Sequence, residues 1–129
     1  GFLQRTCDSL GFSDVNCLHA RAEDAPKELR GSFDIATARA VAALNVLCEL
    51  CLPFVKIGGC FIAMKGPDCA EELESAKAAI HLLGGKFEKQ ITYTVPGTDI
   101  RHSAVVIRKV AGTSSKYPRR WAMIKKQPL

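Results

Sequence analysis

Short apolar runs separated by turn residues mark five stretches of the chain as strands. Cys60–Met64 is a continuous apolar run, which is typical of a strand covered on both faces. The last two strands are joined through Pro96-Gly97 with no intervening helix, so they are predicted to form an antiparallel hairpin. The predicted strands are Val15–His19, Phe33–Thr37, Cys60–Met64, Phe87–Val95 and Ser103–Val110, with a turn at Gly58-Gly59 before the third.

Apolar residues at helical spacing lie between these runs. Residues 2–11 are predicted to be the end of a helix closed by Gly11, and residues 22–29 a short helix with a Pro26 start. Val41–Leu52 and Cys69–Leu83 have the apolar stripe of helices that cover a sheet. Beyond Thr113 no strand or helix pattern is clear.

Alternation of strands and helices predicts an α/β fold with a mostly parallel sheet and helices on both faces. The chain has 129 residues, about the length of one domain. Its 47% apolar and 24% charged residues are ordinary for a globular protein. No apolar run approaches the ~20 residues of a membrane-spanning helix, so we expect no membrane association.

The net charge of +5 comes entirely from the last 14 residues. Residues 1–115 carry 13 basic and 13 acidic side chains, and no acid follows Asp99. A neutral body with a basic tail favours a polyanionic partner, although a tail that only keeps the protein soluble has the same composition. The basic residues of the tail are Lys116, Arg119, Arg120, Lys125 and Lys126.

Six cysteines do not indicate a disulfide framework here. Cys48, Cys51 and Cys60 lie in apolar segments of a chain that has enough core without bridges. A zinc site is not favoured either, because Cys48-x-x-Cys51 has no second pair and the three histidines are scattered. Free thiols are typical of a reducing compartment, so we expect a cytoplasmic protein.

Polar residues follow three of the predicted strands at the end where an open α/β sheet binds its ligands. Glu23 follows the first, Arg39 the second, and Lys65-Gly66 the third. In a parallel sheet these residues would share one edge, so we expect them to form one site. The sequence contains neither a Gly-rich phosphate loop nor a nucleophile elbow.

Five motifs, in this order, resemble the glucose-inhibited division protein B family, bacterial small-subunit (16S) ribosomal RNA guanine-N7 methyltransferases. The resemblance runs from about Phe2 to Leu129 and is specific except at the generic Gly-Gly turn. The motifs are His19-Ala-Arg-Ala-Glu-Asp24, Phe33-Asp-Ile-Ala-Thr-Ala-Arg-Ala-Val-Ala42, Leu52-Pro-Phe-Val-Lys-Ile-Gly-Gly59, Phe61-Ile-Ala-Met-Lys-Gly66 and Lys116-Tyr-Pro-Arg119.

The resemblance implies a class I, Rossmann-like fold that binds S-adenosyl-L-methionine. It implies that Ala22 and Glu23 contact the cofactor's adenosine and that Arg39 lines the cofactor pocket near the transferred methyl group. It places Lys65 and Gly66 beside the target base, and the basic tail on ribosomal RNA. Trp121–Ile124 departs from the family, where a Gly-Thr-Pro stretch is expected.

A second departure is that the family's Gly-rich first loop and ribose-binding acid are not in this sequence. The chain is therefore expected to be a C-terminal portion of the enzyme: residues 1–112 part of the Rossmann-like domain and 113–129 a basic tail. Its S-adenosyl-L-methionine site would be incomplete, and Val15–His19 would lie beyond two missing strands. The other four strands would stay contiguous, in the order 33–37, 60–64, 103–110, 87–95.

Two functions remain open at this point. The parent protein would methylate guanine N7 in ribosomal RNA, with this chain inactive alone. Alternatively, the chain is a non-catalytic remnant that forms a homodimer through exposed strand edges or binds RNA through its tail. A class I methyltransferase acting on a small molecule is disfavoured by the single-sign tail.

Overall fold

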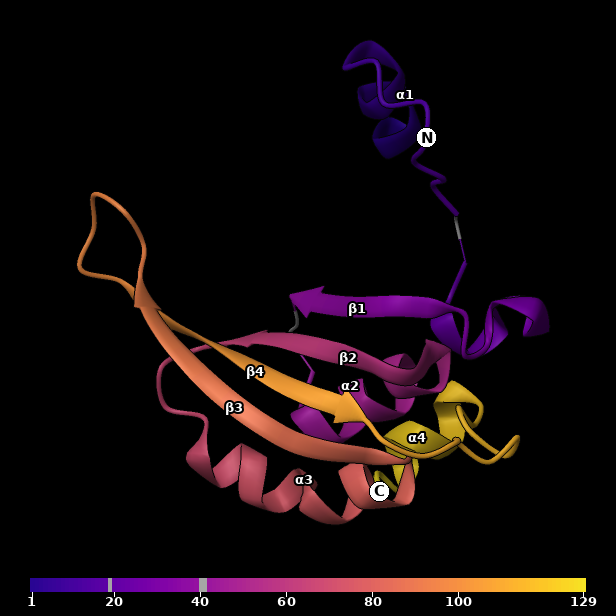
Figure 1. Cartoon of the computed structure of the whole chain (residues 1–129), viewed down its shortest axis with the longest axis vertical. Coiled ribbons are helices and arrows are strands. Elements are labelled where there is room, and N and C mark those ends of the chain that lie inside the picture. The colour runs from indigo at the N-terminus through magenta and orange to yellow at the C-terminus, as the bar shows by residue number, and fades with distance from the viewer. Residues whose placement is uncertain (19, 40–41) are drawn as a thin grey trace.

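A four-stranded mixed sheet forms the body of the protein in this computed structural model (Figure 1). The structure describes residues 1–18, 20–39 and 42–129. The elements are α1 (Phe2–Ser9), the 3-10 turns η1 (Ala22–Asp24) and η2 (Lys27–Leu29), β1 (Phe33–Arg39), α2 (Leu44–Cys51), the 3-10 turn η3 (Leu52–Phe54), β2 (Val55–Lys65), α3 (Ala70–Leu82), β3 (Gly85–Thr94), β4 (Arg101–Lys109) and α4 (Trp121–Lys126).

The strand order β1-β2-β4-β3 is the order predicted from the sequence. β1 and β2 are parallel, with Arg39 beside Met64 at their carboxyl ends. β4 pairs antiparallel with both β2 and β3, which confirms the C-terminal hairpin. One of the three strand pairings is parallel and two are antiparallel, so the sheet is mixed rather than mostly parallel.

One face of the sheet carries the hydrophobic core. α2 and α3 pack together on this face (Figure 1). Phe61 and Ala63 of β2, and Val105 and Ile107 of β4, point into it and are fully buried. The opposite face is not covered by a helix in the described parts of the chain, and its apolar residues Phe33, Ile35, Met64, Ile91 and Tyr93 are exposed.

The strand predicted at Val15–His19 is wrong for the residues described, because residues 15–18 form no strand and residue 19 lies outside the described part. A strand needs a hydrogen-bonded neighbour, and none of the four strands pairs with this segment. Leu18 is consequently 66% exposed. The helix predicted over 22–29 is two 3-10 turns, with Pro26 as the N-cap residue of the second.

The turn predicted at Gly58-Gly59 lies inside β2, which begins earlier than predicted. Phe33 pairs with Val55, but Ile35 already pairs with Cys60, so β2 bulges between these two pairs. A Cβ atom at Gly59 would lie 2.3 Å from the carbonyl oxygen of Asp34. Glycine is therefore required at Gly59 by the close approach of the β1 backbone.

Lys109, the last residue of β4, is buried at the amino end of the sheet. Its Nζ donates to the carbonyl oxygens of Leu52 and Val55, at 2.6 and 3.1 Å. Burial, with a smaller contribution from Arg30, lowers the pKa of this ammonium to about 8. Lys109 thus donates hydrogen bonds to backbone carbonyls at η3, where no following helical turn supplies N–H donors.

The basic tail is docked on the body rather than free. Glu49 of α2 is fully buried, and Arg119 donates to it from its backbone N at 2.8 Å, Nε at 2.9 Å and Nη2 at 2.8 Å. These hydrogen bonds raise the pKa of the Arg119 guanidinium. Tyr117 and Ile124 of the tail are also buried. The segment after Thr113, which had no clear pattern in the sequence, therefore has its own anchors and a short helix.

None of the helices described is long and apolar enough to cross a membrane. All six cysteines carry free thiols, and Cys48, Cys60 and Cys69 are buried.

Gly59→Ala is expected to lower the free energy of unfolding by about 1–3 kcal/mol, because the added methyl group must push two strands apart. Chemical denaturation measures this change. Gly112→Ala is the matched control, since a Cβ there meets nothing within 4 Å. Equal stability of the two variants would contradict the close packing at Gly59.

Glu49→Gln is expected to cost about 3 kcal/mol of stability, because it leaves the Arg119 charge half-buried without a counter-charge. Thermal or urea unfolding gives the value. Glu88→Gln, which breaks the exposed pair with Arg108, should cost less than ~1 kcal/mol. A Glu49→Gln protein as stable as Glu88→Gln would mean that the Arg119–Glu49 pair does not hold the tail.

Candidate functional site

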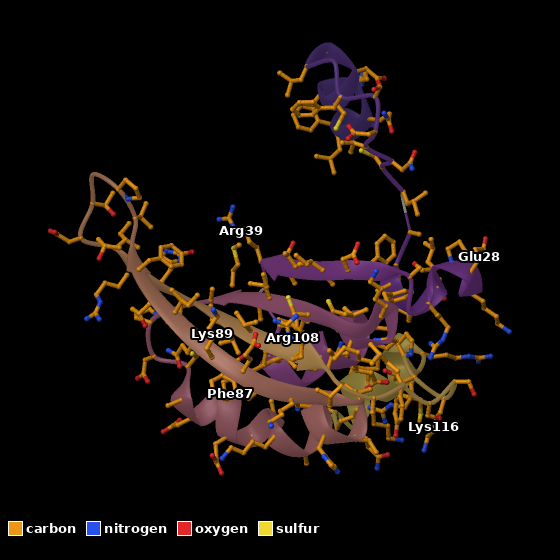
Figure 2. All side chains as sticks on the ribbon, viewed as in Figure 1. Glu28, Arg39, Phe87, Lys89, Arg108 and Lys116 are labelled. Atoms are coloured by element: carbon orange, nitrogen blue, oxygen red, sulfur yellow. The ribbon has the colours of Figure 1, made fainter. Side chains whose placement is uncertain are left out.

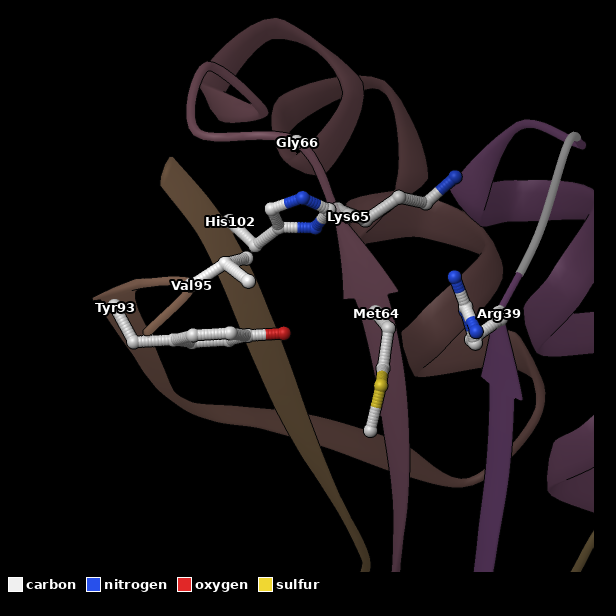
Figure 3. A pocket seen from close by; sticks show the side chains of 7 residues that line it. All are labelled: Arg39, Met64, Lys65, Gly66, Tyr93, Val95 and His102. Atoms are coloured by element: carbon white, nitrogen blue, oxygen red, sulfur yellow. The ribbon is translucent and has the colours of Figure 1, made fainter. Parts of the chain in front are cut away.

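The main functional candidate is an open cavity of about 550 Å³ at the carboxyl end of β1 and β2 (Figure 3). Its size is within the range of small-molecule sites. Arg39 forms one side, and residues of the β3–β4 hairpin form the other. The lining residues are Arg39, Met64, Lys65, Gly66, Tyr93, Val95 and His102.

The sheet register explains why residues so distant in sequence meet here. Arg39 is paired with Met64, and Met64 with Ala104, so these three lie in one row across the uncovered face. Tyr93 and His102 are register partners on the same face, one pair further along the hairpin. Alternation of side chains along each strand puts this set on the face opposite the core.

Lys65 is held by the protein instead of projecting as a free cation. Its Nζ lies 2.6 Å from the carbonyl oxygen of Ala42, to which it donates, and 2.6 Å from a carboxylate oxygen of Glu72. Only 8% of the Lys65 side chain is exposed. It therefore links the end of β2, the first turn of α3 and the segment leading into α2.

Arg39 forms no ion pair with any carboxylate among the described residues, and its side chain borders the cavity (Figure 3). Among the residues described it is thus the cation at this edge that is open to a ligand. The prediction that Arg39, Lys65 and Gly66 meet at one edge agrees with their common place in this cavity.

Glu23 is not at this edge, which corrects the expectation that it would join Arg39 and Lys65. Ala22 and Glu23 line a separate cavity of about 310 Å³, together with Phe54 and Tyr117. Phe54 directly precedes β2, so this cavity borders the opposite end of that strand. The expectation depended on a strand at 15–19, and without that strand nothing directs residues 22–24 to the carboxyl edge.

Arg30 is what ties this segment to the amino end of the sheet. Its guanidinium donates to the carbonyl oxygens of Tyr117 and, at 3.1 Å, Ser114. The chain from η1 to β1 is thereby joined to the tail.

The basic residues of the tail fall into two groups. Arg119 is bonded to Glu49, so its guanidinium anchors the tail. Four others are exposed, namely Lys116, Arg120, Lys125 and Lys126. Figure 2 shows Lys116 and Arg39 at opposite ends of the body, so one ligand reaching both must span the molecule.

The thiols nearest the site are not poised as nucleophiles. Burial raises the pKa of Cys48 above its ordinary value and raises that of Cys51 to about 11. No group of three or more His, Cys, Asp or Glu that could hold a metal ion occurs in the described ranges. The cavity offers positioning groups and no acid–base pair.

Sequence reasoning missed Tyr93, Val95 and His102. The available signal was the hairpin itself, since strands on either side of Pro96-Gly97 bring these residues close together. No local motif marks them: Tyr93 and Val95 belong to a predicted strand, and His102 falls in the connection before the next one.

Comparison with solved structures gives the fold independently of the sequence motifs. The structure is similar to M. jannaschii TYW2 in complex with AdoMet, with a TM-score of 0.63 and 14% identity, over 84% of this chain and 52% of that one. At this identity the similarity shows the fold alone.

Curated relatives are much closer in sequence. The chain is 49% identical to a ribosomal RNA small subunit methyltransferase G of Clostridium botulinum (strain Loch Maree / Type A3) and 48% identical to that of Alkaliphilus metalliredigens (strain QYMF). Each match covers 99% of this chain and 54% of the relative, so the chain spans about half the length of the curated relatives it matches.

A family model described as GidB, rRNA small subunit methyltransferase G, matches residues 1–102, which is well over half of the chain. The resemblance found in the motifs is thereby confirmed, and the chain belongs to the GidB family.

Proposed function

We propose that this chain supplies the target-facing part of an S-adenosyl-L-methionine-dependent methyltransferase that modifies guanine N7 in small-subunit ribosomal RNA. The observation that carries the proposal is the cavity at the carboxyl end of β1 and β2, with Arg39 open to a ligand, in a member of the GidB family. In open α/β sheets this edge is where ligands bind.

The lining of the cavity fits only part of the cofactor. Arg39 offers a charge suited to a carboxylate, such as that of a methionine moiety, but no acidic side chain lines the cavity to accept hydrogen bonds from ribose hydroxyls. Ala22 and Glu23, expected to contact adenosine, lie at the other end of β2. The residues that the structure describes therefore do not fit the whole of S-adenosyl-L-methionine, and the proposal assigns this cavity to the target base.

Methylation of guanine N7 requires no acid–base chemistry from these residues. The N7 atom carries a lone pair and no proton, so attack on the methyl group of a sulfonium requires no general base. Placement of the acceptor in line with the donor is then the main contribution, and proximity can supply ~7–11 kcal/mol. Arg39 would hydrogen-bond guanine O6, while Lys65 and Gly66 shape the edge beside the base. This division agrees with a cavity that has no acid–base pair.

The four exposed cations of the tail would bind RNA phosphates. They face no acidic residue of their own segment, since no acid follows Asp99. Because Lys116 lies at the opposite end of the body from Arg39 (Figure 2), the proposal requires an extended polyanion, which a ribosomal RNA provides.

The alternative of a non-catalytic chain rests on the open edge of β1. Among the strands that the structure describes, β1 pairs only with β2, so its other edge is available to a strand of a second copy. Homodimerisation through this edge stays a prediction.

The reactivity of guanine N7 toward dimethyl sulfate tests the proposal without requiring catalysis. Bound to the chain, unmodified small-subunit ribosomal RNA should show one guanine with reduced N7 methylation. Arg39→Ala should weaken this protection about 5- to 100-fold in the protein concentration needed, as expected for loss of a guanine contact worth about 1–3 kcal/mol.

Arg5→Ala, an exposed arginine of α1, is the matched control and should keep the protection. Absence of any protected guanine, or equal protection by Arg39→Ala, would contradict the proposed target site.

Alanine at Lys116, Arg120, Lys125 and Lys126 together should lower the slope of log K against log salt for RNA binding by up to roughly 3, because each phosphate contact in a single strand contributes ~0.7. Arg119 is left unchanged so that the tail stays docked. Filter binding at several salt concentrations gives the slope, with alanine at the exposed Lys77 and Lys86 as control. An unchanged slope would remove the tail from RNA binding.

A further inference from the structure

Tyr93 and His102 form an aromatic pair at the mouth of the cavity that the sequence motifs do not assign. Their ring centroids lie 5.9 Å apart with an interplanar angle of 26°, which is a stacked arrangement. Both side chains line the cavity (Figure 3), and Tyr93 remains 39% exposed despite the stack. The pair therefore presents aromatic surface toward the space that Arg39 borders.

Cross-strand packing alone would explain a stacked pair in a hairpin, since such pairs stabilise sheets. Several observations go beyond that role. The pair lies on the face of the sheet that no described helix covers, so its rings pack against no core. The pair, Met64 and Arg39 also follow one another around a single concave surface, with the aromatic side opposite the cationic side (Figure 3).

This combination matches the chemistry of an unstacked purine. Proteins hold single-stranded RNA bases by stacking them on aromatic side chains and by hydrogen-bonding their edges. An arginine reads guanine O6, and a thioether such as that of Met64 makes favourable contacts with aromatic rings.

We propose that Tyr93 and His102 form a stacking shelf for the target guanine, with Met64 beneath the base and Arg39 at its O6 edge. The inference rests on the proposed function, which it deepens by naming the residues that hold the base. Tyr93 and His102 are positioning residues for the base: they orient it and take no proton from it.

Titration with guanosine 5′-monophosphate, followed by NMR of the aromatic side chains, tests the shelf directly. The chain has only two tyrosines, so the buried Tyr117 is an internal control. We expect saturable upfield ring-current shifts at Tyr93 and His102 and none at Tyr117. Uridine 5′-monophosphate should bind more weakly because a pyrimidine offers a smaller stacking face.

Variants separate stacking from general sheet stability. Tyr93→Leu keeps an apolar strand residue but removes the ring, and should weaken guanosine 5′-monophosphate binding about 5- to 100-fold, in line with ~1–3 kcal/mol per stacked base. Tyr93→Phe should stay within about twofold of the unaltered chain. Ile91→Ala, on the same face of β3 but outside the cavity lining, should also bind guanosine 5′-monophosphate within about twofold of the unaltered chain. Binding by Tyr93→Leu equal to that by Ile91→Ala would overturn the shelf.

Different results would contradict the stacking shelf and the proposed RNA target site. A dimethyl sulfate footprint that Tyr93→Leu leaves intact would overturn the shelf and leave the target site in place. Nucleotide shifts that depend on Tyr93, without any protected guanine in ribosomal RNA, would support the shelf as a base-binding site and contradict the proposed RNA target.

Discussion

The ammonium group of Lys65 is the constraint on which the candidate site depends. It ends β2 and is held between the carboxylate of Glu72 in α3 and the backbone oxygen of Ala42 before α2. Almost no solvent reaches it, so loss of either partner would leave a charge poorly compensated. One side chain thus fixes the relative position of three chain connections at the carboxyl edge. Arg39, at the end of β1, takes its place in the cavity from that arrangement.

The second determinant of the site is the position of the antiparallel strand β4 within the sheet. An antiparallel β4 inserted between β2 and β3 brings the far end of the hairpin to the carboxyl end of the parallel pair. His102 and Tyr93 reach the edge where Arg39 and Met64 end because of this pairing. Because side chains alternate along each strand, the face opposite the core keeps exposed apolar residues. One side of the cavity on that face is aromatic, and the other side is cationic. The family's relatives contain nearly as much sequence again outside the matched region.

Much of this fold could be predicted because its signals are local. The apolar runs of β1 and β2, the stripe of α3 and the hairpin around Pro96-Gly97 each determine their own element, and the family resemblance gave the strand order. The failures concern partners that a local pattern does not contain. Residues 15–18 lack a neighbouring strand, so Glu23 lies away from the site that was expected to include it. The docked tail depends on Glu49 and Arg119, 70 residues apart, and the aromatic pair depends on hairpin register.

Hydrogen–deuterium exchange of the chain, with and without small-subunit ribosomal RNA, tests the central claim that the carboxyl edge of the sheet faces the target. The account predicts slower backbone exchange on RNA binding at residues 63–66 and 93–102, in addition to the tail. Slower exchange confined to residues 113–129, with the sheet edge unchanged, would contradict it.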